Sequence, residues 1–105
     1  MRRHKVRFSA AAKSDLIEIG DYIAQEDPVA ALRLIEKIEE QCLSLEMLPE
    51  RYAVNRHLSA NLEYRVLVIG NYLAIYRIEA TYEVSVIRVF HGARNYHKIL
   101  KDNSS

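Results

Sequence analysis

The stretch that decides the fold is Tyr64–Ile78, YRVLVIGNYLAIYRI, together with Glu83–Phe90, EVSVIRVF. Both segments are rich in valine, isoleucine and tyrosine, which favour β-strands. Gly70-Asn71 interrupts the first segment, and a glycine at this place is typical of the two-residue turn that joins antiparallel strands. The sequence therefore predicts a three-stranded antiparallel meander with strands at 64–69, 72–78 and 83–90.

The turns also predict the register of this meander. The Gly70-Asn71 turn places Arg65 opposite Tyr76. The length of the second loop is ambiguous, and the apolar pattern favours a three-residue loop at 80–82, which places Tyr76 opposite Val86 and Ala74 opposite Arg88. In this register one face is aliphatic and is expected to lie beneath helices: Val66, Val68, Leu73, Ile75, Ile87 and Val89. The other face is expected to be open to solvent and holds Arg65, Tyr72, Tyr76 and Arg88.

The chain before the meander begins with one strand and one helix. Lys5–Phe8 is short and half apolar, as expected of a strand. Ser9 is a typical N-cap, because its hydroxyl can accept a hydrogen bond from a free amide of the first helical turn. Apolar residues then recur at helical spacing, with Asp15, Glu18 and Asp21 expected on the solvent side.

A second helix follows directly. Asp27 is its expected N-cap and Pro28 its first residue, and Pro49 is expected to end it. The short connection predicts an antiparallel helical hairpin, and residues 50–63 lack periodicity and are expected to form a loop. The chain is thus predicted to be one α+β domain over residues 1–105: an N-terminal strand, a helical hairpin, a three-stranded meander and a short C-terminal helix.

Composition excludes several classes of protein. No apolar run approaches the roughly 20 residues that a membrane-spanning helix needs, and the basic start is not followed by the apolar stretch of a signal peptide. Cys42 is the sole cysteine, which rules out an internal disulfide and a cysteine-based zinc site. We therefore expect a cytoplasmic protein that uses no metal or cofactor.

The net charge of +1 conceals an uneven distribution. Residues 1–13 carry five basic and no acidic side chains, and residues 14–50 carry two basic and ten acidic ones. Residues 51–105 carry eight basic and four acidic side chains. Two oppositely charged faces could meet different partners, although acidic helix surfaces are also common. The small net charge argues against strong DNA binding by this chain alone.

Two groups of residues could carry function. Arg65, Tyr76 and Arg88 are expected on the open sheet face, where arginine can bind carboxylate or phosphate groups through two parallel hydrogen bonds. Long polar side chains are also ordinary on a solvated face. His91 and Arg94 follow the last strand, and His91 is equally explained as a structural histidine.

These features resemble the RelE/ParE superfamily of type II toxin–antitoxin toxins over roughly residues 5–96. The segments that carry the resemblance are Val6-Arg7-Phe8, Ala12, Asp15-Leu16, Ile19, Tyr22-Ile23, Asp27-Pro28, Ala30-Ala31, Leu48-Pro49, Tyr64–Ile78 and Ile87–Arg94. The helical-hairpin pattern alone would fit many small proteins, whereas the two late segments are specific in combination.

The superfamily contains two activities. Resemblance to RelE-like members would imply a ribosome-dependent mRNA endoribonuclease whose sheet face is rich in lysine and arginine. This chain has no lysine between Lys37 and Lys98, and Gly92 follows the histidine where those nucleases tend to have arginine. The His91–Arg94 segment, HGAR, instead resembles the ParE branch, which implies a non-enzymatic inhibitor of DNA gyrase that meets nucleic acid only through the gyrase complex.

The resemblance assigns residues to each role. It implies target binding by Arg65, Tyr76, Arg88, His91 and Arg94. If the chain is a nuclease, the alternative catalytic set is Arg65, Arg88, His91 and Tyr96. A third alternative is a toxin-like protein that has lost toxicity and serves as a regulatory or DNA-binding partner.

The resemblance also implies a cognate ParD-like antitoxin with a ribbon–helix–helix start, encoded alongside, which folds as it wraps the toxin. Its expected contacts are Ile19, Tyr22, Ile23, Leu34, Ile38, Arg65 and Arg88. Because the helical hairpin is acidic, an acidic antitoxin would need apolar or basic residues where it crosses those helices.

Overall fold

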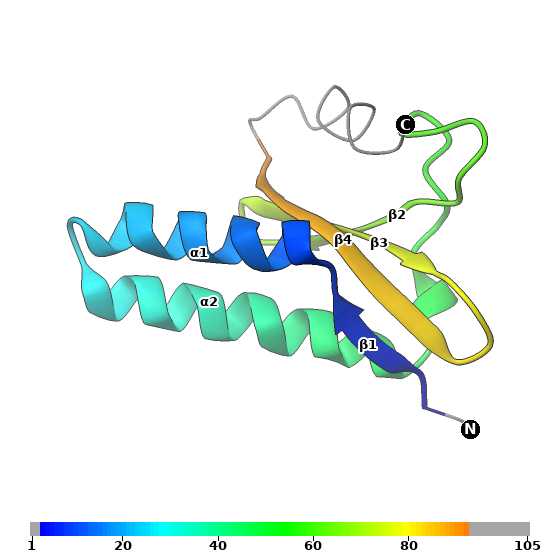
Figure 1. Cartoon of the computed structure of the whole chain (residues 1–105), viewed down its shortest axis with the longest axis horizontal. Helices are drawn as coiled ribbons and strands as arrows, with labels where there is room; N and C mark the ends of the chain where they lie inside the picture. Colours follow the sequence, from blue (N-terminus) through cyan, green and yellow to red (C-terminus); the bar gives the residue numbers. More distant parts are fainter. Residues whose placement is uncertain (1–2, 93–105) are drawn as a thin grey trace.

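A computed structural model of the chain describes residues 3–92, which form two helices packed on one face of a four-stranded sheet (Figure 1). The elements are β1 (Lys5–Phe8), α1 (Ala10–Ala24), α2 (Pro28–Leu43), the short 3-10 helices η1 (Ser44–Glu46) and η2 (Pro49–Arg51), β2 (Arg65–Ile69), β3 (Tyr72–Ile78) and β4 (Glu83–His91). This order confirms the predicted strand, helical hairpin and meander. Within residues 3–92 no helix is both long and apolar enough to cross a membrane.

The helices begin where the sequence predicts. The Ser9 hydroxyl accepts a hydrogen bond from the Ala12 amide at 3.0 Å, and the Asp27 carboxylate accepts one from Ala30 at 3.0 Å. The second helix ends earlier than expected. The α-helix stops at Leu43, and η1 tightens the chain into a 3-10 turn before Pro49 is reached, a common way for a helix to end.

The sheet order is β1-β4-β3-β2, with β1 parallel to β4 and the other pairs antiparallel. β1 pairs only with the first half of β4, from Glu83 to Val86. The second half of β4 is therefore a free edge, and α1 lies beside it (Figure 1). Ser9 satisfies one backbone group of this edge, because its hydroxyl donates a hydrogen bond to the Ile87 carbonyl oxygen at 2.7 Å.

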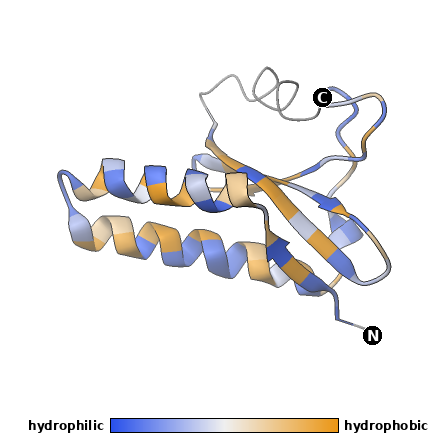
Figure 2. Cartoon of the chain, viewed as in Figure 1, coloured by the Kyte–Doolittle hydropathy of each residue, from blue (hydrophilic) through white to orange (hydrophobic). Residues whose placement is uncertain are grey.

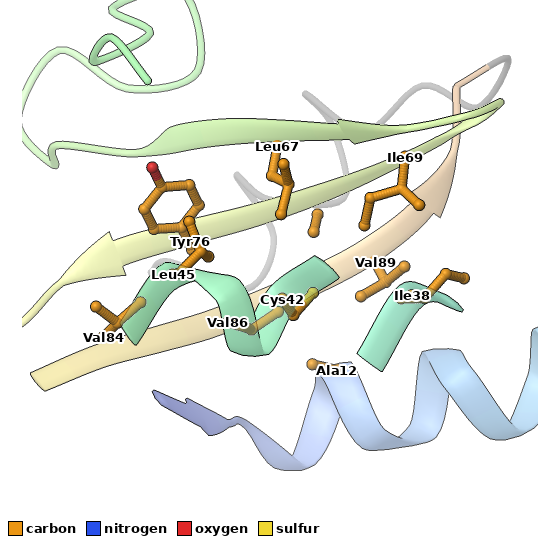
Figure 3. Packing of buried hydrophobic residues seen from close by; sticks show 11 residues of the cluster. Ala12, Ile38, Cys42, Leu45, Leu67, Ile69, Tyr76, Val84, Val86 and Val89 are labelled. Atoms are coloured by element: carbon orange, nitrogen blue, oxygen red, sulfur yellow. The ribbon is translucent and has the colours of Figure 1, made fainter. Parts of the chain in front are cut away.

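The larger core lies between α2 and the sheet. Leu67 and Ile69 point from β2 toward Cys42 and Ile38 of α2, and Tyr76 of β3 lies in the same cluster beside Leu45 of η1 (Figure 3). Cys42 is fully buried, and burial raises the pKa of its thiol to about 12. The cysteine therefore packs as a small hydrophobic residue, as its position on the helix suggests. Figure 2 shows that hydrophilic and hydrophobic residues alternate along both helices.

The register of the first hairpin is confirmed and that of the second is corrected. Gly70 has φ of 59°, and Arg65 lies opposite Tyr76 as predicted. Tyr76 lies opposite Val86, also as predicted, but Ala74 lies opposite Val89 rather than Arg88. A register shift between Ile75 and Tyr76 places an extra residue in β4, a β-bulge that a count from the turn does not foresee.

The helices also cover the opposite face of the sheet from the one predicted. The helix-covered face holds Leu67, Ile69, Ala74, Tyr76, Val84, Val86 and Val89. The opposite face, here called the outer face, holds Val66, Val68, Leu73, Ile75 and Ile87, with Tyr64, Leu58 and Leu62 packed at one end. Of the six residues predicted beneath the helices, Val89 lies there and the other five do not. Both faces are apolar, so alternation alone could not distinguish them.

Candidate functional site

Arg65 and Tyr76 do not form an open binding platform. The Tyr76 side chain is fully buried, and its hydroxyl donates a hydrogen bond to the Pro49 carbonyl oxygen. Arg65 donates to the carbonyl oxygens of Glu50, at 3.2 Å, and Tyr52. Burial raises the pKa of Tyr76 to about 12. Both side chains fasten the segment after η1 to the sheet, which corrects their predicted role as a solvated recognition surface.

Arg88 is also bound within the protein. Its Nε and Nη2 atoms each lie 2.7 Å from an oxygen of Asp15, and that carboxylate also accepts the Val89 amide at 2.9 Å. Only 13% of the Arg88 side chain and 6% of the Asp15 side chain are exposed. The hydrogen bonds to Asp15 raise the pKa of Arg88. Arg88 thus holds α1 against the free edge of β4, and its Cα lies on the opposite face of the sheet from that of Arg65.

Asp15 is the structural residue that sequence reasoning missed. It was expected on the solvent side of the first helix, yet it is buried. Its spacing gives the signal that could have identified it, since Asp15 lies three residues after buried Ala12 and four before Ile19, which packs on the core. A carboxylate on a buried helix stripe predicts a basic partner.

The outer face is aliphatic where β2, β3 and the end of β4 meet. Val66, Leu73 and Ile87 are partly buried around fully buried Ile75, and 63% of Val68 is exposed. Arg88 lies at the margin of this face with its guanidinium carbon 4.7 Å from the centre of the Phe90 ring. Arg77 lies on the same face of β3 as Ile75, with its guanidinium carbon 5.9 Å from the centre of the Tyr64 ring. Between Arg77 and Arg88 the outer face offers apolar contacts.

A groove separates α1 from the ends of β3 and β4. It has a volume of about 430 Å³ and is lined by Asp15, Glu18, Ile19, Tyr22, Tyr72, Val89, Phe90 and His91. Tyr22 is 75% exposed, and the rings of Tyr72 and His91 meet edge to face at 5.3 Å. The structure thus brings two predicted antitoxin contacts, Ile19 and Tyr22, together with His91, a predicted target contact.

The remaining predicted residues differ in accessibility. Ile38 is fully buried beneath the sheet, so the structure corrects its assignment as a partner contact. Leu34 packs against the same core, and Ile23 is partly buried. Arg94, Tyr96 and the expected C-terminal helix lie outside the described residues. Within residues 3–92 there is no cluster of metal-binding side chains.

Comparisons with known proteins show the family to which this chain belongs. Residues 6–96 match the family described as the ParE toxin of the type II toxin–antitoxin system parDE. The chain belongs to the ParE toxin family. This ParE-family chain is 30% identical to a Sinorhizobium fredii protein named "Putative toxin Y4kP", over 95% of its own length and 100% of that protein. It is therefore a type II toxin–antitoxin toxin of the RelE/ParE superfamily, as the sequence resemblance predicted.

Solved structures share the fold of this ParE-family toxin. It is similar to a chain of the chromosomal ParDE toxin–antitoxin system from P. aeruginosa, with a TM-score of 0.70 and 23% identity over 85% of this chain and 96% of the other. It is also similar to a chain of the RelBE2 toxin–antitoxin complex from Mycobacterium tuberculosis, with a TM-score of 0.64 and 26% identity over 90% and 97%. Both similarities confirm the predicted RelE/ParE-like fold.

Proposed function

We propose that this ParE-family toxin is a non-enzymatic inhibitor of DNA gyrase that acts in the cytoplasm. The observation that carries the proposal is the aliphatic outer face around Ile75, where Val66, Val68 and Leu73 offer apolar contacts. Such a surface suits recognition of another protein, because burying apolar area is the main source of free energy in protein association. Binding to a polyanion would instead need cations along its path.

The arrangement of the two arginines supports the same proposal over an RNA-cutting activity. Cleavage of RNA needs a base, an acid and cations gathered around one phosphate. Arg65 and Arg88 belong to opposite faces of the sheet, and both guanidiniums already bind protein oxygens. Two members of the alternative catalytic set therefore do not meet at one site, and His91 lies on the groove with α1 instead.

The groove between α1 and β4 is our proposed docking site for a cognate ParD-like antitoxin. Its walls present apolar Ile19 and the exposed ring of Tyr22, with Glu18 supplying a carboxylate. Asp15 also lines the groove, but Arg88 balances its charge. A partner segment that carries apolar and basic side chains would therefore complement the groove.

The proposal predicts inhibition of purified gyrase. Adding the toxin to gyrase and relaxed plasmid should reduce supercoiling and accumulate cleaved DNA bound to the enzyme. The protein encoded by the adjacent antitoxin gene should relieve this inhibition. A culture that expresses the toxin without its antitoxin should form filaments and induce its DNA-damage response.

The nuclease alternative predicts different results. Ribosomes supplied with the toxin would cut mRNA, and alanine at Arg65, Arg88 and His91 would abolish that cleavage. Early arrest of translation with cut mRNA, together with unaffected gyrase, would contradict our proposal. A chain that inhibits neither target would favour the third alternative, a regulatory protein that has lost toxicity.

A further inference from the structure

The surface of the helical hairpin that faces away from the sheet carries a short stripe of Lys13, Ile17 and Asp21 along α1. All three side chains are exposed, and Ile17 is exposed to 65%. Residues spaced by four form one ridge along a helix. The stripe therefore presents an apolar centre with a cation on one side and an anion at the same distance on the other.

A hollow lies beside this stripe, between the two helices. It has a volume of about 370 Å³, and its apolar lining comes from Leu16, Gly20 and Ile35. A Cβ atom on Gly20 would lie 3.4 Å from Cγ1 of Ile35. Because glycine has no side chain here, the hollow stays open and can receive an apolar side chain from outside.

We propose that this stripe and hollow are the contact between two copies of the chain. In an antiparallel crossing of two α1 helices centred on Ile17, Lys13 lies opposite Asp21 of the partner subunit. Twofold symmetry repeats the pair, so the same patch serves both subunits. Ile17 of each subunit then enters the space beside Gly20 of the partner subunit.

Charge complementarity favours a second copy over other occupants. The stripe carries one cation and one anion at equal distances from its centre, which is the arrangement that complements itself. Glu39 also lines the hollow and opposes association, whereas acidic residues more than about 8 Å from the contact are largely screened at physiological salt. Burial of Ile17 in the contact lowers the free energy of the dimer, because it removes an exposed aliphatic side chain from water.

Sedimentation equilibrium of the full chain in physiological salt tests the proposal. The wild type is expected to form dimers in the micromolar to millimolar range. Lys13→Glu and Asp21→Lys should each raise the dimer Kd by about tenfold or more, because each places like charges opposite one another. The double variant Lys13→Glu/Asp21→Lys should restore the wild-type Kd to within about threefold, since the pairs are rebuilt with their signs exchanged.

Matched controls separate this contact from a general effect of charge. Lys37→Glu and Glu40→Lys change exposed residues of α2 away from the stripe and should leave the Kd unchanged. Ile17→Ser should weaken the dimer without changing any charge. A chain that remains monomeric at millimolar concentration would overturn the proposal, as would a double variant no better than the single ones. Stripe variants that weaken only the antitoxin complex would also overturn it, because the surface would then belong to that partner.

Discussion

Replacing Asp15 with alanine is expected to destabilise the toxin by about 3 to 5 kcal/mol, the usual cost of breaking a buried ion pair. The substitution removes both hydrogen bonds to Arg88 and the one to the Val89 amide. The Arg88 guanidinium then lacks its counter-charge, although only 13% of the Arg88 side chain is exposed to solvent. Urea denaturation followed by circular dichroism measures the free energy of unfolding directly.

Glu36→Ala is the matched control, because Glu36 is an exposed carboxylate of α2 and makes no ion pair within residues 3–92. It should change the free energy of unfolding by less than about 0.5 kcal/mol. The double variant Asp15→Leu/Arg88→Met should recover much of the loss, since apolar pairs of similar volume often replace buried ion pairs well. An Asp15→Ala variant as stable as the wild type would show that the pair does not hold α1 to β4.

Tyr76 is expected to show the second large effect. Tyr76→Ala should destabilise the protein by about 3 to 5 kcal/mol, because it leaves a cavity beneath the helices. Tyr76→Phe keeps the ring and should cost about 1 to 2 kcal/mol, the loss of the buried hydrogen bond to Pro49. The same denaturation experiment measures both values, and equal losses for the two variants would contradict the packing of this ring.

The pKa of Tyr76 adds a dependence on pH. Burial raises this pKa from 10.0 to about 12, so the unfolded chain loses the proton first as the pH rises. The contribution of the neutral phenol is therefore fully present below pH 10 and is lost between pH 10 and about 12. The difference in stability between wild type and Tyr76→Phe should shrink over that interval. A constant difference would contradict the raised pKa.

Local sequence signals predicted the elements well. Ser9 and Asp27 cap their helices as expected, and Gly70 forms the turn that sets the first hairpin register. These predictions depend on interactions between residues close in sequence, which a single chain displays directly. The end of α2 is the exception, because its last turn tightens before Pro49 is reached.

The site was harder to predict because it depends on one bulge and on which of two apolar sheet faces the helices cover. The extra residue at Ile87 reverses the face of everything after it in β4, and both faces were apolar enough to accept either assignment. Arg88 was therefore predicted beside Arg65 and Tyr76, whereas Tyr76 was predicted on the surface because the helices were assigned to the wrong sheet face. The buried charge of Asp15, the partner of Arg88, could have corrected that interpretation. Ile19 and Tyr22, two expected antitoxin contacts, both line the groove beside β4, and their contact with an antitoxin stays a prediction.

Gyrase inhibition by a Val68 variant tests most directly whether the aliphatic outer face recognises a protein target. Val68→Glu places a charge on that face at a side chain already 63% exposed, and Val29→Glu makes the same change at a 59% exposed position on α2. We predict that Val68→Glu raises the toxin concentration needed for half-inhibition of supercoiling by about tenfold or more, while Val29→Glu matches the wild type. Full inhibition by Val68→Glu would contradict the proposed role of this face.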